Sequence, residues 1–490
     1  MLWLEKYKRD ELQDDSEFLA RAQVGQDVGQ VARELFPQGV EIVFNAEELA
    51  GMAERTKESI NQGAKTIYEA TFEYQGIFVM VDILQVENDG VVLNEVKSST
   101  GAFKDTKAQP PKEEYLWDLG IQYYVLKGLG YNIKGVYLIC LNHTYTRQGA
   151  LDLEKLFLKN DFLEFIKGFQ SQISKELERM RQILENPQEP SQDIGAHCDN
   201  PYRCKAMAYC WQEQKGIVGT SHVFAITNLR MDKKMKFYQN GQVLFKDLTA
   251  ADLKKLSDKQ RRQMVCSLEQ QTHINKEAIQ EFLNTLNYPL CHLDFETYQS
   301  AIPSFDGMKP YSQIPFQYSL HIEYADGRME HQEFLAECGT DGRLALAEQL
   351  IKDIPENACV LAYNAFFEKS VLQGLVDLFA PTIPKVSQAL LQVRNRILDL
   401  MIPFKEGYYY DPKMGGSYSI KSVLPALVPD FEKTYKDLDL VHNGEEAMAA
   451  YAKMSSLPRD EQDRYKQALL EYCKLDTLAM VKVLEVLKGI

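Results

Sequence analysis

The chain has 490 residues, 45% of them hydrophobic, and a formal net charge of −15 at pH 7. This length predicts two or three domains, and the acidic balance opposes nonspecific binding of nucleic acid by the whole surface. No apolar run reaches the roughly 18 residues of a membrane span, and the charged N-terminus is unlike a signal peptide, so we expect a cytoplasmic protein that does not bind membranes.

A hairpin is predicted where Asn88-Asp89-Gly90 separates two apolar runs. Asp82 lies on the first run, and Glu95 and Lys97 lie on the second. Asp82 and Glu95 together can hold a divalent metal ion, and Lys97 can orient an attacking water or neutralise charge that develops as a phosphodiester is hydrolysed. Taken alone, these three residues also fit an exposed strand that carries an i,i+2 ion pair.

The residues around this hairpin favour the catalytic interpretation. Glu69 supplies another acid upstream, and a predicted helix downstream carries Gln122. The set resembles the PD-(D/E)XK nucleases of the RecB-like branch, to which the CRISPR-associated RecB-like exonucleases belong. The active-site residues that this resemblance implies are Glu69, Asp82, Glu95, Lys97 and Gln122.

Three cysteines, Cys198, Cys204 and Cys210, follow a long charged segment. In a reduced protein, thiolates at this spacing suit an iron–sulfur cluster or zinc, and buried structural cysteines are the alternative. The RecB-like resemblance implies a [4Fe–4S] cluster, with zinc as the second choice. Relatives place a fourth cysteine just upstream of a Leu-Trp-Leu like that at Leu2 to Leu4, so we expect the fourth ligand to lie outside this sequence.

A second acidic motif closes the apolar run Tyr288 to Leu293. Residues at i and i+2 of a strand face the same side, so Asp294 and Glu296 point to one spot. Two carboxylates so placed repel each other unless a cation lies between them, and Mg²⁺ and Mn²⁺ prefer oxygen ligands of this kind. Alone, the motif also fits an edge strand that carries two solvated acids.

Two later helices carry further candidates. Glu368 opens one predicted helix, and Tyr472 and Asp476 lie four residues apart on another, so that both face the same way. The combination resembles the DEDD exonucleases with a ribonuclease-H-like fold, tyrosine subclass, although that family usually has Asp where this chain has Glu368. The resemblance implies that two Mg²⁺ or Mn²⁺ ions are bound, that Tyr472 orients the attacking water, and that the metal-binding residues are Asp294, Glu296, Glu368 and Asp476.

The whole arrangement, including Gly415 to Pro425, resembles a bacterial family catalogued as domain of unknown function 2779. We therefore expect an α/β protein with a RecB-like, restriction-endonuclease-like domain over residues 1–215 and a ribonuclease-H-like, mixed-sheet DEDD domain over residues 286–490. Residues 216–285 are expected to form a helical connector, in which Met235 to Leu244 resembles a polar strand.

These motifs predict a metal-dependent nuclease with two active sites. We expect 3′→5′ exonuclease action on single-stranded DNA at the C-terminal site, although RNA ends are an equal chemical possibility. The tyrosines Tyr408 to Tyr410 and Tyr418 fit either base stacking or ordinary packing. The alternative function is that of a nucleic-acid-binding or assembly protein whose catalytic sites have decayed. The sequence identifies no protein partner.

Overall fold

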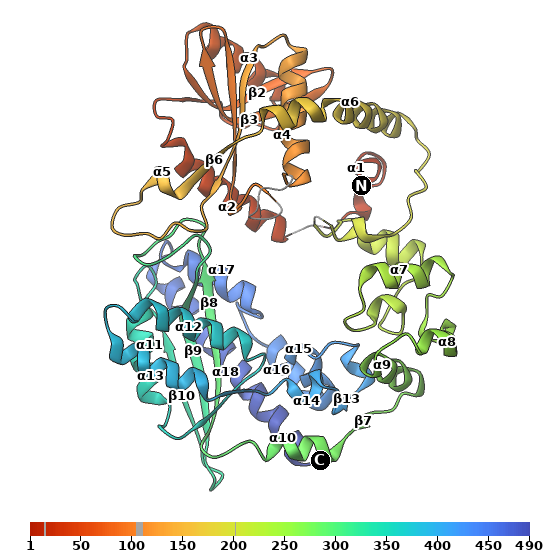
Figure 1. Ribbon diagram of the computed structural model, residues 1–490, viewed down its shortest axis with the longest axis vertical. Coiled ribbons are helices and arrows are strands. Elements are labelled where there is room, and N and C mark those ends of the chain that lie inside the picture. The colour runs from red at the N-terminus through yellow and green to blue at the C-terminus, as the bar shows by residue number, and fades with distance from the viewer. Residues whose placement is uncertain (14–15, 104–110, 201) are drawn as a thin grey trace. The chain divides into compact units, whose positions relative to one another are not determined.

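The structure, a computed structural model, forms two compact units (Figure 1). The first unit comprises Met1–Gly216 and Ser300–Ser312, and the second comprises Ile217–Gln299 and Gln313–Ile490. The predicted α/β fold class is confirmed, because each unit combines a mixed sheet with helices. No described helix is long and apolar enough to cross a membrane. The residues that the structure describes are 1–13, 16–103, 111–200 and 202–490.

The first unit is built on a six-stranded sheet in the order β1-β2-β3-β4-β5-β6. β4 runs parallel to β5, and the predicted hairpin is confirmed as the antiparallel pair of β3 and β4. The strands are β1 Val40–Glu41, β2 Thr66–Tyr74, β3 Ile77–Glu87, β4 Gly90–Lys97, β5 Ile133–Leu141 and β6 Phe157–Asp161. The helices are α1 Leu2–Tyr7, α2 Ser16–Arg33, α3 Leu49–Asn61, α4 Glu113–Gly128, α5 Leu153–Leu156 and α6 Leu163–Glu185.

The second unit is built on a five-stranded sheet in the order β10-β9-β8-β11-β12. β8 pairs antiparallel with β9 and parallel with β11, so the sheet is mixed, as expected. The strands are β8 Leu290–Gln299, β9 Gln313–Glu323, β10 Met329–Leu335, β11 Cys359–Ala362 and β12 Ile397–Asp399. The helices after β8 are α11 Arg343–Asp353, α12 Phe366–Phe379, α13 Pro384–Asn395, α14 Ile402–Lys405, α15 Ile420–Leu427, α16 Glu432–Lys436, α17 Gly444–Met454 and α18 Arg459–Lys488.

The two faces of β8 have different surroundings. Cys291, Leu293 and Phe295 alternate with polar residues and join the core that includes α11, α12 and α13. Asp294 and Glu296 therefore lie on the opposite face, against which α18 and α17 pack. Figure 1 shows α18 running beside β8 and β9. The alternation along one strand thus directs both carboxylates toward a single helix.

The segment expected as a separate connector clusters with the second unit from Ile217 onward. Its elements are α7 Met231–Gln239, α8 Ala250–Leu253, α9 Asp258–Glu269, β7 His273–Ile274 and α10 Lys276–Leu283, and β7 pairs with β13 Tyr409–Tyr410. The strand expected over Met235 to Leu244 is wrong, because α7 covers its first half. Met231, Met235 and Tyr238 recur at i, i+4 and i+7, which is helical spacing.

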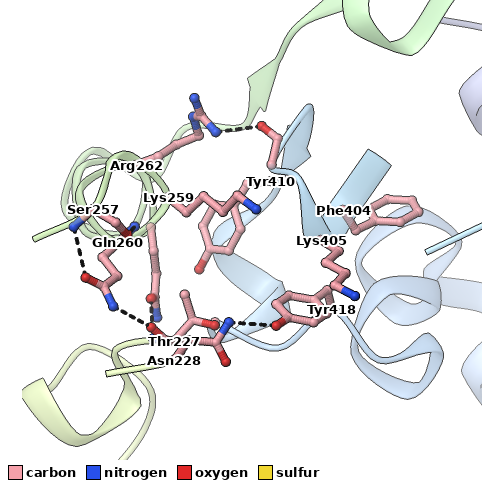
Figure 2. A pocket seen from close by; sticks show the side chains of 13 residues that line it. Thr227, Asn228, Ser257, Lys259, Gln260, Arg262, Phe404, Lys405, Tyr410 and Tyr418 are labelled. Carbon is pink, nitrogen blue, oxygen red and sulfur yellow. Dashed lines mark hydrogen bonds between the residues drawn. The ribbon is translucent and has the colours of Figure 1, made fainter. Parts of the chain in front are cut away.

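Helix α9 explains why this segment belongs to the second unit. Lys259 pairs with Glu406 at 2.6 Å, and Arg262 donates a 2.7 Å hydrogen bond to the carbonyl of Gly407. Figure 2 shows these residues of α9 around a cavity of about 70 Å³ that Tyr418 also lines. These two cations of the basic helix therefore have partners within the unit.

Candidate active sites and comparison with known proteins

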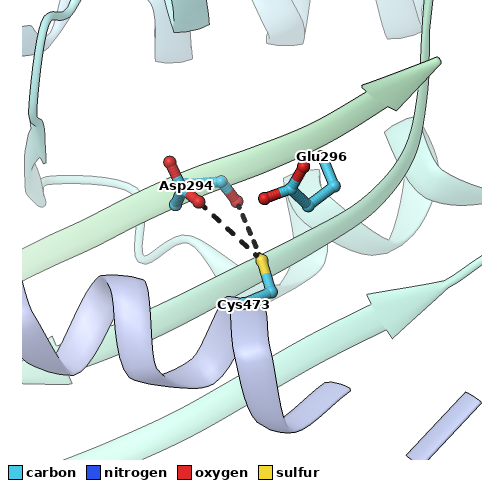
Figure 3. Close-up of side chains that lie close together, drawn as sticks. All are labelled: Asp294, Glu296 and Cys473. Atoms are coloured by element: carbon cyan, nitrogen blue, oxygen red, sulfur yellow. Dashed lines mark hydrogen bonds between the residues drawn. The ribbon is translucent and has the colours of Figure 1, made fainter. Parts of the chain in front are cut away.

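The carboxylates of Asp294 and Glu296 lie beside the thiol of Cys473 on α18 (Figure 3). One ligand atom from each of these three residues lies within 4.8 Å of the other two. Glu296 is only 7% exposed, Cys473 is fully buried, and Asp294 is half-buried. Among the described residues, Asp294, Glu296 and Cys473 form the one group of three or more Asp, Glu, His or Cys side chains whose donor atoms lie close enough together to hold a metal ion.

Glu368 and Asp476 bring further negative charge to this site. Glu368 lies in the first turn of α12, is 2% exposed, and its Oε2 atom has no hydrogen-bond partner among the described residues. Burial and the charges of Asp476, Glu296 and Glu368 raise the pKa of Asp294 well above its usual value. The structure therefore brings together the four acids that motifs in three separate segments of the sequence predict as metal ligands.

The pKa values of the other three acids are raised as well. Burial and the charge of Asp476 raise the pKa of Glu296 to about 8. Burial raises the pKa of Glu368 to about 8 and that of Asp476 to about 6. Carboxylates with raised pKa values lack sufficient positive charge nearby, and a bound cation would reverse the shift.

Two neighbours of these acids, Tyr435 and Lys421, are not among the predicted site residues. The hydroxyl of Tyr435 donates a 2.6 Å hydrogen bond to Oδ1 of Asp476. The charge of Lys421 lowers the pKa of both Glu296 and Asp476, partly offsetting burial. Lys421 lies on α15, within the segment Gly415 to Pro425 that the family resemblance includes, and Tyr435 lies on α16. Tyr472, the predicted tyrosine, also hydrogen-bonds to Asp476.

A cavity of about 330 Å³ adjoins the carboxylates, since Lys421 and Tyr435 line it. Its apolar wall consists of Ile420, Leu424 and Pro425. Tyr409 and Tyr410 are instead buried within the core, which favours packing over base stacking for these two residues.

In the first unit, three acids occupy one row across β2, β3 and β4. The register pairs Ile83 with Asn94, which places Asp82 opposite Glu95. Glu69 and Asp82 are left out of the pairing of β2 with β3, although the register is the same on both sides of them. The φ of Glu69, 55°, lies in the left-handed region that non-glycine residues rarely adopt. The chain distortion thus occurs at a predicted site residue.

Lys97 lies between two carboxylates of this site. Its Nζ atom is 2.6 Å from Oε1 of Glu95 and 2.5 Å from Oδ2 of Asp118. Gln122 donates a 2.7 Å hydrogen bond to Oε2 of Glu95 and a weaker one of 3.3 Å to Asp118. Asp118 was not selected as a site residue from the sequence, although it lies one helical turn before Gln122 on α4.

The charges of the first unit's site are better balanced than those of the second. Burial raises the pKa of Asp82 to about 7, although Lys97 and a 2.7 Å hydrogen bond from the backbone N–H of Val96 oppose the shift. Burial and the charge of Asp82 raise the pKa of Glu95 well above its usual value. Burial lowers the pKa of Lys97, but Glu95, Asp118 and Asp82 together outweigh burial and raise it, so this lysine stays protonated.

Glu69 has a separate partner, because Arg33 donates a 2.7 Å hydrogen bond to its Oε1 atom. Its charge still contributes to the raised pKa of Asp82. Glu69 therefore lies close enough to raise the pKa of Asp82, while its own carboxylate is paired with Arg33 at the end of α2.

The three clustered cysteines lie near the N-terminal helix α1. Trp3 and Leu4 of that helix join a small core to which Cys204 and Cys210 also contribute. Burial and then the charges of Cys204 and Cys198 raise the pKa of Cys210, while the terminal ammonium group lowers it. The sulfur atoms of these three described cysteines do not all lie within 4.8 Å of one another. A tetrahedral zinc site would hold them about 3.8 Å apart.

Comparison with known proteins gives two matches. Residues 291–419 match a family described as "Domain of unknown function (DUF2779)". The chain is also 23% identical over 211 residues to the uncharacterized protein UU173 of Ureaplasma parvum serovar 3, a match that covers 39% of this chain and 30% of that protein. No solved structure matches. The family match includes Asp294, Glu296 and Glu368 and ends before α18.

Proposed function

We propose that the second unit hydrolyses phosphodiester bonds of single-stranded nucleic acid with the help of divalent metal ions. The observation that carries this proposal is the convergence of four acids with raised pKa values, which are Asp294, Glu296, Glu368 and Asp476. Folding alone gains nothing by burying four acids together, because each must be kept neutral or compensated. A site that needs cations for function accounts for the arrangement.

The oxygen donors fit Mg²⁺ or Mn²⁺, and these four carboxylates would hold the ions. When bound, a pair of such ions would stabilise the attacking and leaving oxygens of an in-line displacement. Tyr472 and Tyr435 hold Asp476 by hydrogen bonds, and Tyr472 would orient the attacking water beside it. Lys421 supplies the positive charge that is available to a phosphate group at this site.

The cavity beside the acids supports an unpaired substrate. Its apolar wall can receive a nucleobase that is not engaged in base pairing, and two of the polar residues that line the cavity, His442 and Asn443, already hydrogen-bond to Glu446 at 2.9 and 2.7 Å. The apolar side chains of this wall offer no hydrogen-bonding groups that could distinguish one base from another. We therefore expect little sequence preference. Degradation in the 3′→5′ direction from a free end is what the resemblance to the DEDD exonucleases implies.

We also propose a second nuclease site in the first unit, at which Asp82 and Glu95 hold a metal ion and Lys97 stabilises charge that develops on phosphate. The support is the row of acids across three strands and the ordering of Glu95 by Gln122 and Lys97. The three cysteines would bind a [4Fe–4S] cluster, with zinc as the alternative. A decayed nucleic-acid-binding protein remains the alternative function, favoured by Glu368 in place of Asp.

The test is degradation of end-labelled single-stranded DNA and RNA with Mg²⁺ and with Mn²⁺. We expect Glu296→Gln to abolish a ladder from the 3′ end and Lys97→Ala to abolish a second activity. Glu356→Gln, at an exposed position of the second unit, is the matched control and should leave both activities unchanged. If the wild type and the double variant are equally inert while both still bind the labelled strand, the binding-protein alternative replaces this proposal.

A further inference from the structure

Cys473 places a thiol among the carboxylates of the second unit. Its Sγ atom lies 3.9 Å from Oδ2 of Asp294 and 4.0 Å from the carbonyl oxygen of the same residue. Figure 3 shows the sulfur pointing from α18 toward Asp294 and Glu296. The site therefore offers one soft donor beside two hard ones, which an all-oxygen magnesium site does not.

Two further observations show that the negative charge of this group is not compensated by the described side chains around it. In the part of the chain that the structure describes, Cys473 is the one side chain that donates a hydrogen bond to the carboxylate of Asp294. Nearby, the buried Glu368 has a carboxylate oxygen without any described partner, and its charge acts on both Asp294 and Glu296. A weak S–H donor cannot compensate this much buried negative charge.

We propose that Asp294, Glu296 and Cys473 bind one divalent transition-metal ion of the zinc type, which Mg²⁺ does not replace. This inference rests on the proposed metal-dependent function of the same site and specifies which ion one of its positions selects. Thiolate ligands select zinc and similar ions, whereas Mg²⁺ requires near-octahedral oxygen coordination.

The geometry agrees with this choice of ion. Zinc lies about 2.3 Å from sulfur and about 2.0–2.2 Å from carboxylate oxygen, so a tetrahedral ion holds its sulfur and oxygen donors about 3.6 Å apart. The observed distance from Sγ of Cys473 to Oδ2 of Asp294 is 3.9 Å. Three protein donors leave one tetrahedral position open, which is the donor count of catalytic zinc sites.

Binding requires the thiol to lose its proton. Burial and the charges of Asp294 and Glu296 raise the pKa of Cys473 well above its usual value, so the metal-free site holds a neutral thiol. When the ion binds, the S–H bond is replaced by a metal–sulfur bond and the proton passes to the buffer. No electron is transferred in this step.

Cobalt(II) binding to the purified full-length protein tests the proposal, because Co²⁺ bound to thiolate shows a sulfur-to-metal charge-transfer absorption in the near ultraviolet. We would titrate the wild type, Cys473→Ser and Glu296→Gln, and follow the difference spectra. Cys291→Ser is the matched control. Cys291 is fully buried on β8, the strand that carries Asp294 and Glu296, but it faces the opposite side of the sheet. Cys198, Cys204 and Cys210 are present in every variant, so any absorption from Co²⁺ bound to them cancels in the difference spectra.

We expect an absorption component that is lost in both Cys473→Ser and Glu296→Gln and kept in Cys291→Ser, because one ion needs both donors. The affinity for Zn²⁺, measured by competition with Co²⁺, should fall roughly tenfold or more in Cys473→Ser. Substituting even a residue that only hydrogen-bonds to a metal ligand lowers metal affinity about 10–100-fold. Excess Mg²⁺ should not displace the component. Circular dichroism of each variant establishes that it is folded.

The outcomes separate this inference from the proposed function. A folded Cys473→Ser protein with an unchanged spectrum and unchanged Zn²⁺ affinity overturns the inference, even if the wild type degrades nucleic acid with Mg²⁺. A component that depends on both Cys473 and Glu296 supports the inference, even if no nucleic acid is degraded. Ready displacement of that component by Mg²⁺ would also overturn the selectivity that we propose.

Discussion

The hydroxyl of Tyr435 lies 2.6 Å from Oδ1 of Asp476 and donates a hydrogen bond to it, although 41 residues separate the two in the chain. Asp476 also receives a hydrogen bond from Tyr472, which lies one helical turn before it on α18. Two tyrosines therefore hold this carboxylate. The sequence indicated the local one, and only the placement of α16 beside α18 supplies the other.

We expect Tyr435→Phe to weaken Mn²⁺ binding more at pH 6 than at pH 8. The hydrogen bond favours the ionised form of Asp476, so its loss raises the pKa of this acid above its present value of about 6. At pH 6 the affinity should fall roughly tenfold, because hydrogen bonds to charged groups contribute about 1.5–3 kcal/mol. Titration calorimetry at both pH values measures this. Tyr465→Phe on α18 is the control, and an equal loss of affinity at both pH values would contradict the prediction.

Glu296→Gln should stabilise the second unit at pH 8 and have little effect at pH 4. The pKa of Glu296 is raised from 4.5 to about 8 in the folded state, so between these values the folded state holds more protons than the unfolded state. The free energy of unfolding must therefore fall as pH rises through this interval. Removing the ionisable group removes the penalty, which we place on the order of 1–2 kcal/mol at pH 8.

Thermal unfolding of metal-free protein across this pH range measures the effect. A gain of about 2–4 °C per kcal/mol is expected for the transition of the second unit. Glu356 is exposed, so Glu356→Gln should leave the unfolding temperature of the second unit unchanged at both pH 4 and pH 8. Added Mn²⁺ should stabilise the wild type at pH 8 more than it stabilises Glu296→Gln. If the two variants have the same unfolding temperature at every pH, Glu296 does not carry the penalty that we describe.

Lys97→Met should destabilise the first unit by about 1–3 kcal/mol at pH 8. The substitution keeps much of the apolar stem of the side chain but leaves Glu95 and Asp118 without the ammonium group that now lies between them. The pKa of Asp82 should rise above its present value of about 7, since the charge of Lys97 lowers it. The loss of stability should therefore shrink on acidification to pH 5, where Asp82 and Glu95, whose pKa values are raised, can be protonated.

Urea unfolding of the wild type, Lys97→Met and Lys127→Met at the two pH values distinguishes this cause from a general packing defect. Lys127 is an exposed lysine of α4 and should tolerate the change. A loss of stability in Lys97→Met that is the same at pH 5 and pH 8 would show that charge compensation is not the reason.

Anaerobic purification should yield a brown protein that absorbs visible light if the cysteines bind an iron–sulfur cluster, and a colourless one if they bind zinc. Cys204→Ser should remove the colour and the bound iron together. Cys140→Ser, a buried cysteine of β5, serves as the control and should keep both. Metal analysis of the colourless protein then decides between zinc and thiols that bind no metal.

The sequence by itself determined the local elements and the residue types of both sites. The hairpin with Asp82 and Glu95, the strand with Asp294 and Glu296, and the helix with Asp476 all follow from short-range periodicity, because alternation along a strand and spacing along a helix fix which side chains share a face. The prediction of a strand over Met235 to Leu244 failed, because the hydrophobic spacing of this short polar segment fits both the period of a strand and that of a helix.

Only the tertiary structure decided which groups surround these acids. Tyr435, Lys421 and Asp118 are not among the predicted site residues, because their contacts with the acids depend on how helices pack. Cys473 lies next to the predicted Tyr472 in the sequence, but a lone cysteine has no ligand partners until α18 packs against β8 and brings its sulfur within 3.9 Å of Asp294. Burial then sets the pKa values, because the cost of charge depends on the loss of water that packing imposes.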